Sequence, residues 1–171
     1  MDIILHIIIL LLLIVLIYQD FTERSVHWFL FPLLIISQFT LTYLSIGWDD
    51  LLLNATVILA LLALQFLLLS LYFSFRNGRL INIINKYIGI GDLFYFLFLC
   101  LAFSPFNFIS FFVGSLLLIL TTYFLLIRTK TKQYKIPLLG SLSIAYIVLL
   151  AVQQISCFNQ FDDALMVHLF L

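Results

Sequence analysis

Residues 87–127 read YIGIGDLFYFLFLCLAFSPFNFISFFVGSLLLILTTYFLLI, and Asp92 is the only charged residue among them. One helical crossing of a bilayer takes roughly 20 apolar residues, so this stretch has about twice the length of a single crossing. Ser104-Pro105 offers a turn near its middle, where a helix should end. The stretch therefore predicts two consecutive membrane-spanning helices.

The rest of the chain has the same apolar character. Of its 171 residues, 65% are hydrophobic and 9% are charged, whereas soluble proteins carry about 25% charged residues. We therefore expect an all-α integral membrane protein, with residues 1–171 forming a single transmembrane domain. Six spans are predicted, at Ile3–Tyr18, His27–Gly47, Leu51–Phe75, Gly89–Phe103, Phe106–Ile127 and Ile136–Phe158.

The positions of the charges support six spans. Cytoplasmic loops carry an excess of Lys and Arg, and with six spans all eight basic residues fall on one side. Most acidic residues fall on the other side, which places both termini outside the cytoplasm. The loop between the third and fourth spans, Arg76–Ile88, has apolar positions at helical spacing and predicts a short amphipathic helix on the inner surface. The alternative is a connector whose long basic side chains anchor the third span at that surface.

Composition also excludes several classes of function. Cys100 and Cys157 are too few and too far apart for a zinc framework or a disulfide scaffold, and we expect no metal and no cofactor. The net charge is zero and topology accounts for the basic residues, so the sequence does not predict nucleic-acid binding.

Two acidic residues stand out, because a charge in hydrocarbon costs several kcal/mol unless it meets a partner or water. Asp20 ends the first span and Asp92 begins the fourth, and the topology assigns both to the cytoplasmic side. Structural alternatives exist for each residue. Asp20 has Arg24 one turn further on as a possible ion-pair partner, and Asp92 stands at a helix N-terminus, where the macrodipole favours a carboxylate.

The motifs around these two acids resemble those of a known protein family. Gly89-Ile90-Gly91-Asp92 resembles the G-x-G-D signature of intramembrane aspartic peptidases, and the wider arrangement is similar to the prepilin and preflagellin peptidase family. Asp20, Arg24 and Val26 match that family's D-x-x-x-R-x-[IV]-P pattern, with His27 in place of Pro. Phe94 stands where the second motif usually has Lys. The segment Ile136-Pro137-Leu138-Leu139-Gly140 also resembles a recurrent feature of the family.

The resemblance implies a six-span peptidase in a prokaryotic cytoplasmic membrane, in its compact form without an N-terminal zinc domain. Its partners would be type IV prepilin-like substrates and the lipid bilayer. Asp20 and Asp92 would be the catalytic pair, and the missing side chains of Gly89 and Gly91 would let a substrate backbone approach. Arg24, Arg76 and Arg79 would bind anionic lipid headgroups, and Glu23 would attract the basic leader of a substrate.

Two carboxylates can hydrolyse a peptide bond when they share one water and one proton. The same residues leave two other hypotheses open. A small transporter would use Asp20 and Asp92 as protonatable sites, since Gly-rich breaks in a span also suit transporters. A catalytically silent scaffold descended from the peptidase would keep the fold, and Phe94 in place of Lys motivates that alternative.

Overall fold

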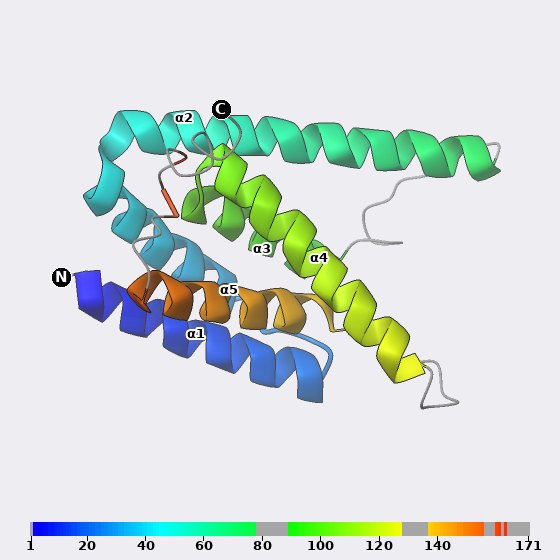
Figure 1. The fold of residues 1–171 in the computed structure, drawn as a ribbon, viewed down its shortest axis with the longest axis horizontal. Coiled ribbons are helices and arrows are strands. Elements are labelled where there is room, and N and C mark those ends of the chain that lie inside the picture. Colours follow the sequence, from blue (N-terminus) through cyan, green and yellow to red (C-terminus); the bar gives the residue numbers. More distant parts are fainter. Residues whose placement is uncertain (1, 78–88, 128–136, 156–159, 162, 164–171) are drawn as a thin grey trace.

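The computed structural model describes residues 2–77, 89–127, 137–155, 160, 161 and 163. Within these residues the secondary structure is entirely helical, as the composition predicts (Figure 1). The helices in chain order are α1 (Asp2–Thr22), α2 (Leu30–Asn77), α3 (Ile90–Ala102), α4 (Pro105–Ile127) and α5 (Leu138–Ile155).

Three segments of these helices are long and apolar enough to cross a membrane, namely Ile3–Thr22, Leu30–Arg76 and Pro105–Leu125. Two shorter apolar helices accompany them, Ile90–Ala102 and Leu138–Gln153. Large hydrophobic side chains cover much of the outer surface; Phe75 is 84% exposed and Ile3 is 76% exposed. Such a surface suits lipid as its solvent, because a soluble monomer rarely exposes large contiguous apolar patches.

Helix α2 contains both the second and the third predicted spans. The two parts meet at Gly47, whose φ of 82° and ψ of −177° interrupt the helical backbone, and the chain changes direction there (Figure 1). The sequence predicts a loop at Asp49 and Asp50, but both residues are helical. A single glycine makes the bend, because it can adopt a conformation that other residues avoid.

The turn predicted at Ser104-Pro105 is confirmed. α3 ends at Ala102 and α4 begins at Pro105, the position where a proline fits the first turn of a helix. Residues after α5 close over this turn, since the backbone amide of Ser104 donates to the carbonyl of Gln160 at 3.0 Å. The Ser104 hydroxyl also bonds to the Asp163 carboxylate. The amphipathic helix predicted at Arg76–Ile88 lies, beyond its first two residues, outside the described residues.

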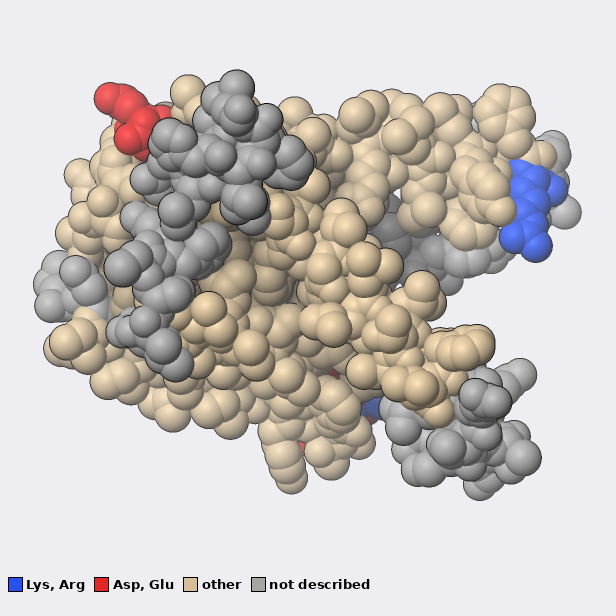
Figure 2. Space-filling model, viewed as in Figure 1, with Lys and Arg blue, Asp and Glu red and all other residues tan. Residues whose placement is uncertain are grey.

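Charges gather at opposite ends of the second part of α2. On the face shown in Figure 2, an acidic patch lies over the bend and a basic patch lies at the far end of the helix. Asp49 and Asp50 follow the bend in the sequence, and Arg76 stands in the last turn of α2. The surface between the two patches is mostly uncharged, which is the distribution expected of a segment that crosses a bilayer.

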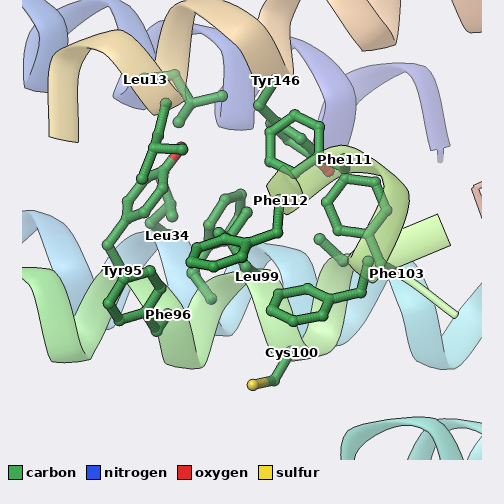
Figure 3. Close-up of a cluster of buried hydrophobic side chains, with 14 of the residues drawn as sticks. Leu13, Leu34, Tyr95, Phe96, Leu99, Cys100, Phe103, Phe111, Phe112 and Tyr146 are labelled. Carbon is green, nitrogen blue, oxygen red and sulfur yellow. The ribbon is translucent and has the colours of Figure 1, made fainter. Parts of the chain in front are cut away.

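One hydrophobic core includes side chains from all five helices. α1 packs against α5 and against α2, and α2 packs against α3. The centre is rich in aromatic rings (Figure 3): Tyr146 of α5 meets Phe98 edge to face, with ring centroids 5.3 Å apart, and Phe103 at 5.6 Å. Cys100 is buried in this core, where a free cysteine packs as a small hydrophobic residue.

Candidate active site

Asp20 lies in the last turn of α1 and faces the beginning of α5. Its side chain is only 9% exposed, and its Oδ2 accepts a hydrogen bond of 2.6 Å from the backbone amide of Gly140. Gly140 belongs to the first turn of α5, where backbone N–H groups have no partner inside the helix. The carboxylate therefore satisfies one of the free donors of α5 and links the end of α1 to the start of that helix.

The contact with α5 depends on the missing side chain of Gly140. A Cβ at this position would lie 2.6 and 2.8 Å from ring carbons of Phe21 and 3.1 Å from Oδ2 of Asp20. No side chain fits at those distances without moving Phe21 or the carboxylate. Glycine is unfavourable inside a helix by about 1 kcal/mol, and here it permits the close approach of two helices.

Asp92 lies in the first turn of α3. Its Oδ2 accepts a hydrogen bond of 3.0 Å from the backbone amide of Gly89, the residue that precedes the helix. Asp92 therefore caps its own helix, which is the structural role that the sequence also allows for this residue. One oxygen of the carboxylate makes this contact. The side chain is half-buried, which leaves it accessible from one side.

Gly91 brings the start of α3 close to α2 and α5. A Cβ on Gly91 would lie 3.3 Å from the ring of Phe31 and 3.5 Å from Cδ1 of Leu139. Leu139 is the neighbour of Gly140, which binds Asp20. The first turn of α5 is therefore the element that both acidic residues share, through Gly140 on one side and Leu139 on the other.

The two carboxylates line one pocket of about 430 Å³, which we call the dyad pocket. Gly89 and Gly91 belong to the wall, and Leu138 and Leu139 form its apolar side. The structure thus brings together two acids that stand far apart in the sequence.

Arg24 also lines the dyad pocket, and its backbone has an unusual conformation. Its φ is 53°, which places it in the left-handed region at the position just after α1. A non-glycine residue there costs of order 1–2 kcal/mol and is held by its surroundings. The side chain of Gln19 contributes, since its Oε1 accepts a hydrogen bond of 3.0 Å from the backbone amide of His27.

The residues around the two acids that the sequence singles out, Arg24, Glu23 and Phe94, do not all line the dyad pocket. Within the described part of the chain, Arg24 forms no ion pair with Asp20, whose Oδ2 is bound to Gly140 instead. Glu23 is exposed and is not part of the pocket wall. Phe94, which stands where the resemblance leads us to expect Lys, packs outside the pocket and stacks on Phe31 with ring centroids 5.8 Å apart.

Sequence reasoning missed two parts of this site. Ser25 lines the pocket, and no pattern in the sequence distinguishes it from an ordinary loop residue. Gly140 was part of a noted motif, yet its contact with Asp20 was not predicted. The sequence feature that could have indicated this contact is a glycine inside an apolar helix, three residues after Pro137. Glycine lowers helix stability, so its presence there suggests that another segment approaches the helix closely. No cluster of three or more His, Cys, Asp or Glu side chains suited to a metal occurs among the described residues.

Comparisons of the chain with protein-family models, with curated proteins and with solved structures gave no match. The function of this protein is therefore inferred from its two motifs and from the geometry of the dyad pocket.

Proposed function

We propose that this protein is a membrane aspartic endopeptidase that cleaves the leader of type IV prepilin-like substrates. The observation that carries the proposal is the dyad pocket, in which the carboxylates of Asp20 and Asp92 face the same space from two different helices. A pair of carboxylates around one accessible cavity is the minimum that water-mediated peptide hydrolysis requires.

In the proposed reaction, the ionised carboxylate takes a proton from a water held between the two acids. The water oxygen then forms a bond to the carbonyl carbon of the scissile peptide, while the protonated acid donates its proton toward the carbonyl oxygen. When the C–N bond breaks, the leaving nitrogen takes the proton that the first acid accepted from the water. One hydroxyl of the tetrahedral intermediate returns its proton to the second acid, so that a carboxyl group forms and the pair again holds one proton. Two neighbouring carboxylates favour this state, because like charges at short distance disfavour double ionisation.

The proposed membrane topology has six crossings, with both parts of α2 counted separately. The bend of α2 and the basic end at Arg76 then lie on opposite membrane sides, and all eight basic residues of the chain lie in the cytoplasm. Asp20 ends α1 and Asp92 begins α3, so both acids lie at the inner rim of the bundle. That depth suits a substrate whose short basic leader stays in the cytoplasm and whose body is a single membrane helix.

The charged neighbours have distinct proposed roles. Arg24 lines the dyad pocket and would bind an anionic lipid headgroup at the rim of the pocket. It would not bind the leader, because a basic leader and the Arg24 guanidinium repel each other. Glu23 is exposed beside it and would attract that leader. The proposed location is the cytoplasmic membrane of a prokaryote, where such substrates are inserted.

The transporter hypothesis fits the positions of the acids less well. A transport site requires its protonatable groups near the middle of the membrane, at broken helices related by a repeat. Asp20 and Asp92 instead stand at helix ends, and the one break inside a described helix is at Gly47, outside the dyad pocket. A catalytically silent scaffold would retain this geometry, and only an activity measurement separates it from the peptidase.

The test is processing of an epitope-tagged prepilin-like reporter expressed together with the protein. Asp20→Asn and Asp92→Asn each remove one ionisable group with little change of shape, and each is expected to lower cleavage by about 10² to 10⁴-fold. Asp50→Asn is the matched control, since Asp50 is exposed on α2 and outside the pocket, and it should cleave like the wild type. Full processing by either dyad variant would refute the proposal.

A further inference from the structure

A second, smaller pocket adjoins the dyad pocket. It has a volume of about 200 Å³, and Asp92 and Leu138 line both cavities. Its other walls come from α2, α3, α4 and α5 and are mainly apolar, with Phe96 and Phe112 among them. We call it the apolar pocket. Sites for drug-sized ligands have volumes of about 300–1,000 Å³, so this one suits a single large side chain.

Gln65 is the polar residue of the apolar pocket besides Asp92. It lies in the second part of α2, and its side chain is exposed among leucines that are also exposed, with Leu64 at 54% and Leu68 at 58%. Gln65 also lines a shallow hollow on the outer face of the same helix, so it stands where that hollow and the apolar pocket meet.

The amide of Gln65 has no hydrogen-bond partner within the described part of the chain. In a bilayer an amide without a partner costs several kcal/mol, because the hydrocarbon has no water to replace it. A glutamine at this position is therefore explained best by a partner that comes from outside the chain.

We infer that Gln65 binds the backbone of the substrate's membrane helix beside the scissile bond, where that helix is unwound, while the apolar pocket holds the adjacent apolar side chain. This inference rests on the proposed peptidase function. It adds a substrate-binding residue on α2 to the two acids on α1 and α3.

Cleavage of a peptide bond in a helix explains why a carboxamide is needed beside the dyad. In an α-helix each peptide carbonyl is bonded to the amide four residues later, so a dyad cannot reach it until a turn opens. The opened turn leaves N–H and C=O groups without partners at the membrane edge. A carboxamide offers both a donor and an acceptor and so satisfies both kinds of group. Since Gln65 and Asp92 share one pocket, the opened turn would lie next to the dyad.

The test measures kcat/KM for the epitope-tagged prepilin-like reporter with purified full-length protein in lipid vesicles. Gln65→Leu removes the amide and keeps an apolar surface. We expect it to lower kcat/KM by about 5- to 100-fold, because a polar group of the substrate loses its hydrogen bond and has no other partner. Leu64→Ala is the control: its side chain is exposed one residue away and does not line the apolar pocket, so it should stay within about twofold of the wild type.

A second reporter distinguishes substrate binding from a structural role. It carries two glycines in the first membrane turn, where each lowers helix stability by about 1 kcal/mol. Because this turn opens more easily, the Gln65→Leu variant should recover several-fold on the glycine reporter relative to the original one. A variant with a damaged fold would lose activity equally on both reporters.

Equal losses on the two reporters, or wild-type cleavage of the original reporter by Gln65→Leu, would overturn the role of Gln65. If Asp20→Asn and Asp92→Asn are inactive in the same experiment, the peptidase function stands without it. If the wild type leaves both reporters uncut, the peptidase function is refuted and the inference fails with it.

Discussion

The backbone amide of Gly140 donates a hydrogen bond of 2.6 Å to Oδ2 of Asp20 and thereby joins the start of α5 to the end of α1. This contact sets the direction of one proposed catalytic carboxylate. It also places Leu139 against the start of α3, which carries the other carboxylate. The relative position of the two acids thus depends on one short segment of α5.

We expect Gly140→Ala to damage the site more than the fold. Its Cβ would lie 2.6 Å from the Phe21 ring, and overpacking of this kind costs about 1–3 kcal/mol. Relief of the clash moves Asp20, and a displacement of about 1 Å in a catalytic group can lower the rate by about a hundredfold. Reporter cleavage and the thermal unfolding midpoint in detergent should both fall.

Gly114→Ala is the matched control for that change. Gly114 is also a helical glycine, but a Cβ at its position meets nothing within 4 Å. Alanine is a better helix former than glycine, so the variant should unfold at the same temperature as the wild type or slightly higher. If Gly140→Ala behaved like Gly114→Ala in both measurements, the contact with Asp20 would not be needed to position the dyad.

A different prediction concerns Phe94, which stands where the peptidase family that the sequence resembles usually has Lys. Its ring stacks on Phe31 and is not part of the dyad pocket, so the missing lysine leaves the space around the acids unchanged. Phe94→Lys should therefore keep cleavage within several-fold of the wild type and lose about 0.5–1.5 kcal/mol of stability with the aromatic pair. An increase in kcat/KM of a hundredfold or more would instead show that Phe94 disables the site.

Much of this architecture could be predicted from the sequence, because apolar length and charge position follow from the physics of the bilayer. The turn at Ser104-Pro105 and the shared location of Asp20 and Asp92 are examples. The bend at Gly47 was harder to predict, since Asp49 and Asp50 indicate a loop as readily as the first turn of a helix.

The parts of the site that the sequence did not predict are contacts between helices. Gly140 and Gln65 are single residues in apolar helices, and their roles depend on which neighbour faces them. Sequence spacing gives the face of a helix but not its partner. The packing of α1 on α5, which decides the contact of Gly140, joins segments from the two ends of the chain and has no local signal.

We also expect Gly47→Ala to destabilise the protein without any steric clash. A Cβ on Gly47 meets nothing within 4 Å, but the φ of 82° and ψ of −177° belong to a region that is essentially restricted to glycine. The cost should be about 1–3 kcal/mol of folding free energy, visible as a lower unfolding midpoint. Gly114→Ala again serves as the control, because it adds the same methyl group at a helical φ. An unchanged midpoint would mean that α2 does not need its bend.

The last prediction concerns the membrane orientation on which the proposed substrate depends. Single cysteines are introduced at Glu23, Asp50 and Arg76, all exposed in the structure, in a background where Cys100 and Cys157 are alanine. A membrane-impermeant maleimide should label Asp50→Cys in intact cells. It should label Glu23→Cys and Arg76→Cys only after the membrane is permeabilised, because the end of α1, which Arg24 follows, and the basic end of α2 are proposed to be cytoplasmic.

Each outcome of this labelling bears on a different part of the proposal. If Asp50→Cys and Arg76→Cys react from the same side, the second part of α2 does not cross the membrane, and Gln65 loses its lipid-facing position. If Glu23→Cys reacts in intact cells, the end of α1 lies outside, and Asp20 cannot meet a leader held in the cytoplasm. The proposal requires that Asp50 and Arg76 lie on opposite sides of the membrane and that Glu23 lies on the same side as Arg76. The dyad pocket then lies where a basic leader joins its membrane helix.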